Sequence, residues 1–391
     1  MKQAVVLAAG EGRRLRPFTV HKPKAMLSIA GRPIIHYVIE ALVQSGIRDI
    51  ICVVGYEREQ IISYIGDGSQ YGASVSFVAQ EKQLGTAHAL LQAKNHVDKE
   101  FIVLHGNKVI DKETLNGIVE GEPFTIMARR VANPSRYGAI TVQDGWLIGI
   151  EEKPKAPKSN LINEGIYLFD QSIFEYIDNY LDIPEVMLAV IGDKRKIRVI
   201  EGGGRWLDVV YPWDLLSFND VILRDLNTTY GGIIEQGVNI RGKVRIGKNS
   251  IIRSGTNIVG PVVIGEGCEI GPGSCILPST SVGSNVVIST LTEVKNSILE
   301  DDVHIGTGSI VQDSIIDKGT LAGPHFCAWS DEAEVKINGE YHTIRTGVMC
   351  GEGCRFAAGV TVAPGTIIGN NVRVHSLKFV SGMLPDNSLV V

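Results

Sequence analysis

Cysteines, aromatic residues and long apolar runs are all scarce in this sequence of 391 residues. Its six cysteines lack the paired spacing of zinc ligands, so neither a disulfide framework nor a structural metal site is expected. No run approaches the ~20 apolar residues of a membrane-spanning helix. Charged residues also end the N-terminal apolar segment too early for a signal peptide. We therefore predict a cytoplasmic protein with reduced thiols and no membrane partner.

An excess of charge of either sign is also missing, because 38 lysines and arginines face 43 aspartates and glutamates. The net charge of -5 does not favour binding to the negatively charged backbone of nucleic acid, so no nucleic-acid partner is expected. A locally basic pocket for phosphate groups remains compatible with this balance. Glycine, in contrast, is abundant with 44 residues, and it indicates a turn-rich, repetitive region.

Residues 1–230 alternate short apolar runs with helical patterns. Val5–Ala9 predicts a buried strand, 33–45 a helix and 50–54 the next strand. This alternation predicts an α/β domain with a Rossmann-like, mostly parallel sheet that helices cover on both faces. Ligands of such sheets bind beyond the carboxyl ends of the strands, so functional residues are expected directly after strands.

A six-residue period begins at about residue 238. Aliphatic residues recur at every sixth position from Ile246 to Val294, and after a slip the period resumes at Ile298, His304 and Ile310. This period predicts a left-handed parallel β-helix of hexapeptide repeats over residues 238–391. An excursion at about 324–345 is expected to form a small hairpin. Because open β-helix ends and flat faces favour partners, we predict a homotrimer, or a multiple of it, held by this domain.

A glycine-rich turn follows the first predicted strand, in the segment L-A-A-G-E-G-R-R-L-R-P that begins at Leu7. Gly10 and Gly12 let the backbone approach a phosphate closely, and free N–H groups can cradle it. Arg14 and Lys24 add positive charge. Taken alone, the two glycines are equally compatible with a simple tight turn.

The wider segment resembles the sugar-1-phosphate nucleotidylyltransferase family, whose pattern is L-A-A-G-x-G-[TS]-R-L-x-P-x-T followed by K-P-K. Further stretches resemble the family's segments in the same order, namely Q-E-K-Q-L-G-T-A-H-A from Gln80, R-Y-G from Arg136, E-E-K-P from Glu151, N-E-G-I-Y from Asn163 and W-L-D-V from Trp206. The resemblance covers about residues 1–225. The hexapeptide tail is a common companion in archaeal-type bifunctional members.

The resemblance implies transfer of a nucleotidyl group from UTP or dTTP to a hexose- or amino-hexose-1-phosphate, with release of pyrophosphate. It implies Arg14 and Lys24 as catalytic residues, one neutralising pyrophosphate and the other bridging the two reacting phosphates. The implied nucleotide-binding residues are Ala8, Ala9, Gly10, Gly12, Gln80, Gly85 and Thr86, and the implied sugar-binding residues are Gly138, Glu152, Lys153 and Asn163. The implied cofactor is Mg²⁺, held by Asp208 and, as a weaker candidate, Asn107.

Two positions depart from the family's pattern. Arg13 replaces a small hydroxyl residue, and Asn107, followed by Lys108, replaces a metal-binding aspartate. An amide is a poorer ligand of Mg²⁺ than a carboxylate, and Asp111 is an alternative ligand. These departures leave open a catalytically weakened relative that binds nucleotide sugars as a regulatory subunit.

The β-helix leaves a third interpretation open, a bifunctional enzyme that also acetylates glucosamine-1-phosphate. A general base would be needed for this reaction, and His304 and His325 are the candidates. Neither falls where the family's P-H-x-x-Y-V-G-D-S pattern would place its histidine. Acetyl-CoA is therefore the less favoured partner.

Overall fold

The computed structural model describes residues 2–391 and divides them into two compact units. The first contains the residues up to Glu11, Lys22–Met26 and Ile34–Asp208. The second contains Gly12–His21, Leu27–Pro33 and Val209–Val391. Two short N-terminal segments therefore belong to the same unit as the hexapeptide repeats.

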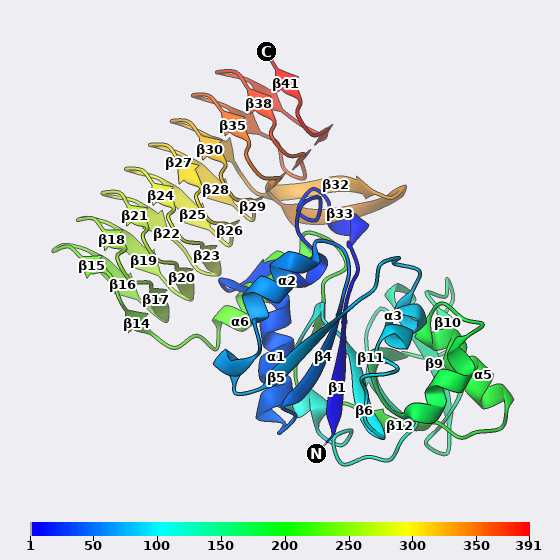
Figure 1. Ribbon diagram of the computed structural model, residues 1–391. Coiled ribbons are helices and arrows are strands. Elements are labelled where there is room, and N and C mark those ends of the chain that lie inside the picture. Colours follow the sequence, from blue (N-terminus) through cyan, green and yellow to red (C-terminus); the bar gives the residue numbers. More distant parts are fainter. Residues whose placement is uncertain (1) are drawn as a thin grey trace. The chain divides into compact units, whose positions relative to one another are not determined.

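A nine-stranded sheet forms the centre of the first unit, in the order β5-β4-β1-β6-β11-β8-β12-β10-β9 (Figure 1). Its strands are β1 (Gln3–Ala8), β4 (Asp49–Val54), β5 (Ser74–Ala79), β6 (Glu100–His105), β8 (Thr125–Arg130), β9 (Gly138–Gln143), β10 (Trp146–Glu152), β11 (Leu161–Asp170) and β12 (Arg198–Glu201). A separate two-stranded sheet pairs β7 (Lys108–Ile110) with β13 (Trp206–Asp208).

The Rossmann-like architecture is confirmed, but the sheet is mixed rather than mostly parallel. Neighbouring strands are parallel from β5 to β6, whereas β11 runs antiparallel to both β6 and β8. Strands β9 and β10 form an antiparallel hairpin whose turn contains Asp144 and Gly145, both with positive φ. After this hairpin, β11 enters the sheet between β6 and β8 in the direction opposite to both, which makes the second half of the sheet mixed.

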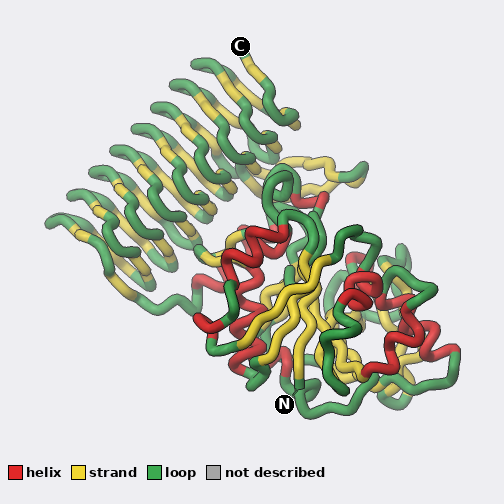
Figure 2. Tube along the Cα trace, viewed as in Figure 1, coloured by secondary structure: helices red, strands yellow, loops and turns green. Residues whose placement is uncertain are grey.

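Helices cover both faces of the parallel strands (Figure 2). Because side chains alternate along a strand, Ala4 and Val6 of β1 pack in the core that includes α1 and α2, whereas Val5 and Leu7 pack in the core that includes α3, α4 and α5. The helices are α1 (Ile34–Gln44), α2 (Arg58–Ile65), α3 (Thr86–Gln92), α4 (Phe174–Ile177) and α5 (Ile183–Gly192).

The predicted parallel β-helix is confirmed in the second unit, where short strands stack into three sheets (Figure 1). The first sheet contains β14 (Thr229–Tyr230), β17 (Val244–Ile246), β20 (Val262–Ile264), β23 (Thr280–Val282), β26 (Ile298–Leu299), β29 (Ile315–Ile316), β34 (Met349–Cys350), β37 (Ile367–Ile368) and β40 (Met383–Leu384). The second contains β15 (Ile233–Ile234), β18 (Ile251–Ile252), β21 (Glu269–Ile270), β24 (Val287–Ile288), β27 (His304–Ile305), β30 (Leu321–Ala322), β35 (Arg355–Phe356), β38 (Arg373–Val374) and β41 (Leu389–Val390). The third contains β16 (Asn239–Arg241), β19 (Asn257–Val259), β22 (Cys275–Ile276), β25 (Glu293–Lys295), β28 (Ile310–Gln312), β31 (Cys327–Ala328), β36 (Thr361–Val362) and β39 (Phe379–Val380).

Two successive coils of the β-helix are a residue shorter than those before them, because Leu299 pairs with Val282 and Ile316 with Leu299 at a spacing of 17 residues. Val282 lies 18 residues after its partner Ile264, but Leu299 lies only 17 after Val282. The expectation that the period resumes at Ile298 and His304 is therefore wrong by one residue, since Leu299 and its successors fill the core and His304 is exposed. A shift of one residue moves a side chain to the opposite face of its strand.

A hairpin of β32 (Asp331–Ile337) and β33 (Glu340–Thr346) leaves the stack. Its turn consists of Asn338 and Gly339, both with positive φ, as in the two-residue turns that suit strand twist. The same unit contains α6 (Asp214–Leu223) and the short strands β2 (Ser28–Ile29) and β3 (Arg32–Pro33). Within residues 2–391, no helix has the length and apolar character needed to span a membrane.

Candidate active site

The carboxyl ends of β1, β4, β5 and β6 lie at one edge of the sheet, because these strands are parallel. Ala8 ends β1 at this edge, and Ala9 and Gly10 follow it. The carbonyl oxygen of Ala9 accepts a hydrogen bond from the Tyr56 N–H (3.1 Å), which joins the loops after β1 and β4. A Cβ added at Gly10 would have no heavy atom within 4 Å. The backbone at Gly10 is therefore open to a ligand.

Gly12 and Arg14 belong to the second unit. Gly12 has a φ of 80°, and its carbonyl oxygen accepts hydrogen bonds from the Leu15 N–H (2.9 Å) and from Thr19 Oγ1 (3.0 Å). Arg14 lies in the 3-10 helix η1 (Arg13–Leu15) with an exposed side chain, and within residues 2–391 no ion pair holds its guanidinium. The turn is thus fixed by Gly12, while Arg14 is accessible to an anion.

Hydrogen bonds within the first unit fix the segment around Gln80, which is expected to bind the base. Gln80 is only 3% exposed and donates hydrogen bonds from Nε2 to the Gly85 carbonyl oxygen (3.1 Å) and to His88 Nδ1 (2.9 Å). A Cβ at Gly85, whose φ is +148°, would overlap the carbonyl oxygen of Leu181. These contacts leave Oε1 of Gln80 as the end of the amide that can accept a hydrogen bond from a base.

Thr86 joins the starts of two helices, which the sequence interpretation missed. Asp182 Oδ1 accepts hydrogen bonds from the Thr86 N–H (2.9 Å) and hydroxyl (3.0 Å), and Thr86 Oγ1 accepts one from the Ile183 N–H (2.9 Å). Asp182 is also the first residue of a D-x-x-E capping box that begins α5. That capping signature is visible in the sequence and could have located this contact.

The four expected sugar-binding residues lie close together: Gly138 begins β9, Glu152 ends β10 and Lys153 follows it, and Asn163 is on β11. A Cβ at Gly138 would be 2.9 Å from Glu152 Oε2 and 3.9 Å from Asn163 Cβ. Lys153 Nζ lies 3.6 Å from Glu152 Oε1, and both of these side chains are about half exposed. Asn163 is buried and donates a hydrogen bond to the Tyr167 hydroxyl (2.7 Å). Glu152 and Lys153 are therefore more accessible to a ligand than Asn163.

A cluster of charged side chains follows the carboxyl end of β6. In the pairing of β7 with β13, Lys108 lies directly opposite Asp208. Lys108 Nζ is 3.8 Å from Asp208 Oδ2, and Lys24 Nζ is 3.6 Å from Asp208 Oδ1. Each oxygen of this carboxylate thus faces an ammonium group. We call Lys24, Lys108 and Asp208 the lysine–aspartate cluster.

Neighbouring charges set the pKa values in this cluster. Burial by itself would raise the pKa of Asp208, but Lys108 and Lys24 outweigh burial and hold this pKa below its usual value. Burial lowers the pKa of Lys108, and Asp208 opposes that shift. Burial and the charge of Lys108 lower the pKa of His105 to about 3, so His105 is neutral at physiological pH.

Glu164 and Arg129 form a second ion pair near this cluster, and neither was singled out from the sequence. The Glu164 side chain is fully buried, and its Oε1 lies 2.5 Å from Arg129 Nε. The backbone oxygen of Glu164 accepts hydrogen bonds from Lys108 Nζ and Trp206 Nε1, both at 2.9 Å. Arg129 pairs with Glu164, whose charge also opposes the lowering of the Lys108 pKa by burial. Three cations, Lys24, Lys108 and Arg129, therefore share two carboxylates, Asp208 and Glu164.

A divalent cation finds few ligands in the lysine–aspartate cluster. Asp208 supplies a single carboxylate, whose buried Oδ1 has no hydrogen bond, and Asn107 in the preceding turn supplies only an amide. Asp111 accepts hydrogen bonds from the N–H groups of Thr114 (3.0 Å) and Arg205 (2.9 Å), so it is engaged in capping. Across residues 2–391, no three His, Cys, Asp or Glu side chains are grouped to hold a metal. One carboxylate between two ammonium groups does not fit a resident divalent cation.

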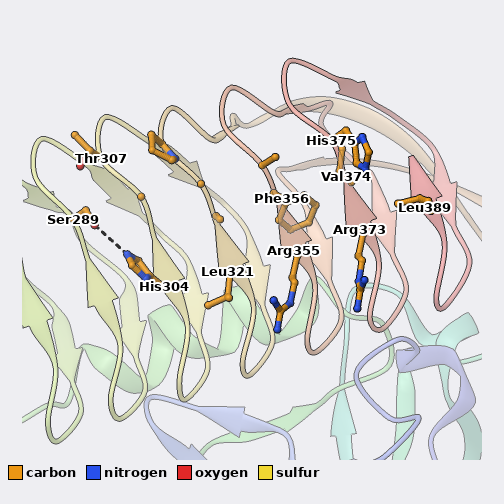
Figure 3. Close-up of a pocket in the computed structure, with 15 residues that line it drawn as sticks. Ser289, His304, Thr307, Leu321, Arg355, Phe356, Arg373, Val374, His375 and Leu389 are labelled. Carbon is orange, nitrogen blue, oxygen red and sulfur yellow. Dashed lines mark hydrogen bonds between the residues drawn. The ribbon is translucent and has the colours of Figure 1, made fainter. Parts of the chain in front are cut away.

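A cavity of about 690 Å³ lies on the second sheet of the β-helix (Figure 3). His304, Leu321, Arg355 and Arg373 occupy successive register positions on β27, β30, β35 and β38, and all four line it. His304 Nε2 lies 3.2 Å from Ser289 Oγ. Neither arginine has an ion-pair partner within the described residues, so the cavity presents two free guanidinium groups.

The chain is similar to several known proteins. Residues 3–224 match the family described as "Nucleotidyl transferase", and residues 258–385 match the "GMPPB C-terminal domain". The "Bifunctional protein GlmU" of Methanocaldococcus jannaschii is 35% identical over 402 residues, which cover 99% of this chain and 97% of that protein. The "Bifunctional sugar-1-phosphate nucleotidylyltransferase/acetyltransferase" of Sulfurisphaera tokodaii is 35% identical over 95% of this chain and 96% of that protein.

A solved structure is also similar. It is a putative glucose-1-phosphate thymidylyltransferase from Bacillus anthracis in complex with a sucrose. The similar region covers 59% of this chain and 98% of the Bacillus anthracis chain, with 28% identity and a TM-score of 0.53. Enzymes of this family act on nucleoside triphosphates and sugar-1-phosphates and generally use a divalent metal. From its matched residues, its similarity along nearly the whole length and its site, the chain belongs to the sugar-1-phosphate nucleotidyltransferase family.

Proposed function

We propose that this enzyme uses UTP or dTTP and a hexose- or amino-hexose-1-phosphate, and releases pyrophosphate and a nucleoside-diphosphate sugar. The observation that carries the proposal is the lysine–aspartate cluster, which lies at the same edge of the sheet as the open backbone of Gly10. The Gly106 N–H, just before this cluster, donates a hydrogen bond to the Leu7 carbonyl oxygen (2.8 Å). Two anions brought to this edge would meet fixed positive charge.

The reaction needs positioning and charge stabilisation more than covalent work from the protein. An oxygen of the sugar phosphate attacks the α-phosphorus, a new P–O bond forms, and the bond to pyrophosphate breaks. We assign Lys24 to bridge the sugar phosphate and the α-phosphate, and the accessible guanidinium of Arg14 to neutralise pyrophosphate. Mg²⁺, a hard cation that prefers phosphate and carboxylate oxygens, is the proposed divalent ion; it would enter with the triphosphate and neutralise part of its charge.

The remaining residues are assigned to the nucleotide and to the sugar. The backbone of Ala8, Ala9, Gly10 and Gly12 would face the nucleotide, with Gly85 and Thr86 shaping the segment that carries Gln80. Oε1 of Gln80 would accept a hydrogen bond from N3–H of uracil or thymine. The proposed sugar contacts are Gly138, Glu152 and Asn163, and Lys153 would meet the phosphate of the sugar. The name of the Bacillus anthracis protein, a thymidylyltransferase, supports a pyrimidine substrate.

Pyrophosphate release tests this proposal. We expect the purified protein to release pyrophosphate with UTP or dTTP in a screen of nucleoside triphosphates against hexose- and amino-hexose-1-phosphates. Lys24→Ala should lower the rate by about 10²-fold or more, the scale for one electrostatic stabiliser. Lys94→Ala, at an exposed lysine of the same unit, is the matched control and should leave the rate unchanged. If no substrate pair releases pyrophosphate although nucleotide sugars bind, the regulatory interpretation replaces this one.

The cavity on the β-helix supports a second candidate function, transfer of an acetyl group to an amino-sugar phosphate. His304 lies within hydrogen-bond distance of Ser289 and could take a proton from the attacking amine, while Arg355 and Arg373 could bind the phosphates of acetyl-CoA. The name of the Sulfurisphaera tokodaii relative includes an acetyltransferase activity. Thiol release from acetyl-CoA in the presence of glucosamine-1-phosphate, lost in His304→Asn, would establish it. An unchanged rate in that variant would exclude His304 as the base.

The β-helix also supports assembly as a homotrimer, or a multiple of it. Leu291, Leu377 and Phe379 are 67%, 84% and 64% exposed on its surface, and apolar side chains so exposed favour burial against another copy. A single 42.4 kDa particle in light scattering would contradict this assembly.

A nucleoside triphosphate substrate and six cysteines without disulfide bonds support the cytoplasm as the compartment.

A further inference from the structure

We propose that Lys108 contacts the phosphates of the bound triphosphate and supplies the fixed positive charge that a carboxylate-held metal would otherwise provide. The inference rests on the proposed function, because it concerns the same site. With Lys108 in this role, triphosphate binding depends less on a protein-bound divalent cation and more on Lys24 and Lys108. Three features of Lys108 carry it: its register, the way its side chain is held and the charge balance around it.

The register places Lys108 on the same carboxylate as Lys24. Lys108 is directly opposite Asp208 in the β7–β13 pair, so the two side chains leave the same face. Both ammonium groups lie within 3.8 Å of an oxygen of Asp208. If Lys24 bridges the two reacting phosphates, Lys108 is close enough to the same carboxylate to meet the same substrate.

The Lys108 side chain is held in place rather than extended into solvent. Its Nζ donates a hydrogen bond to the Glu164 backbone oxygen (2.9 Å) and lies 4.4 Å from the centroid of the Trp206 ring, and the side chain is only 11% exposed. Gly165 makes room for this arrangement, because a Cβ there would be 3.3 Å from Lys108 Nζ and 2.6 Å from His105 Cδ2. The ammonium group is therefore pre-positioned.

The charge balance leaves a surplus of positive charge. Lys24 and Lys108 face one carboxylate, that of Asp208, and the nearby carboxylate of Glu164 is already paired with Arg129. A dication added beside Asp208 would be repelled by both ammonium groups, whereas a phosphate would be attracted by them. If Lys108 only neutralised Asp208, it would be superfluous, because Lys24 already faces that carboxylate. The surplus indicates an anionic ligand.

Triphosphate binding without metal tests the role of Lys108. Binding of dTTP and of UTP to the full-length protein is measured by calorimetry in EDTA, for wild type, Lys108→Gln, Lys108→Arg and the control Lys94→Gln. We expect Lys108→Gln to weaken binding by roughly 10- to 100-fold, the scale of one charged hydrogen bond. Lys108→Arg, which keeps the charge, should retain most of the affinity, and Lys94→Gln should bind like wild type. Equal affinity of Lys108→Gln and Lys108→Arg would overturn the proposal.

Metal binding provides the second readout. Electron paramagnetic resonance of Mn²⁺ in the absence of nucleotide should show negligible binding to wild type and clear binding to the double variant Asn107→Asp with Lys108→Met. Wild-type protein that binds Mn²⁺ as tightly as the double variant would also overturn the proposal. Neither readout needs turnover. If triphosphate binding depends on Lys108 but no pyrophosphate is released, the proposed function fails and this inference stands. If pyrophosphate is released at a rate that does not depend on Lys108, this inference fails and the proposed function stands.

Discussion

Replacing Gly165 with alanine tests how closely the lysine–aspartate cluster is packed. Gly165 has a φ of +73°, a conformation that costs any other L-residue about 1 kcal/mol. The added Cβ would lie 2.6 Å from Cδ2 and 3.0 Å from Nε2 of His105, and 3.3 Å from Lys108 Nζ. Overpacking adds typically ~1–3 kcal/mol. We therefore expect Gly165→Ala to lower the unfolding free energy of the first unit by about 2–4 kcal/mol.

Hydrogen exchange followed by mass spectrometry measures this change, because peptides from β6 and β11 report on the first unit separately from the β-helix. The slowest amides of these peptides should exchange roughly 30-fold faster or more in Gly165→Ala. Gly192→Ala is the matched control, since Gly192 ends α5 in the same unit and a Cβ there meets no heavy atom within 4 Å. The control should be neutral or stabilising by up to ~1 kcal/mol. Unchanged exchange in Gly165→Ala, or equal acceleration in the control, would refute this account of the packing.

Three further predictions concern Gly85, Cys52 and His105 of the first unit. Gly85→Ala should displace the base-reading segment from Leu181 and raise KM for the nucleoside triphosphate by about tenfold or more, as steady-state kinetics would show. Burial raises the pKa of Cys52 to about 12, so a thiol reagent at about pH 8 should modify the partly exposed Cys275 and leave Cys52 unmodified until unfolding, as peptide mapping would show. The pKa of His105 falls from 6.5 to about 3 on folding, so the unfolded chain binds this proton more readily. Stability should therefore fall as pH drops below the unfolded value, by up to ~1.4 kcal/mol per pH unit. Urea unfolding at several pH values should show a shallower dependence in His105→Gln, and an identical slope would contradict the assignment.

The sequence by itself determined the architecture of both halves and the order of the site segments. Strand and turn chemistry is local, so Val5–Ala9 followed by the glycine-rich turn predicted a strand and an open backbone, and both are present. The hexapeptide period is also local, since each coil repeats the same short pattern. Ile246, Ile264 and Val282 therefore stack in the core as the period predicted.

Tertiary structure decided the features that depend on which distant segments meet. Lys108 and Asp208 are opposite each other only because β7 pairs with β13, and nothing near either residue in the sequence indicates that register. The first of the two 17-residue coils turned His304 outward, since one lost residue reverses the face of a strand although the local pattern hardly changes. The mixed strand directions of the central sheet also depend on which distant strands pair, as β11 does with β6 and β8. Strand pairing, register and the packing around Gly165 are properties of contacts between segments far apart in the chain, so local periodicity does not contain them.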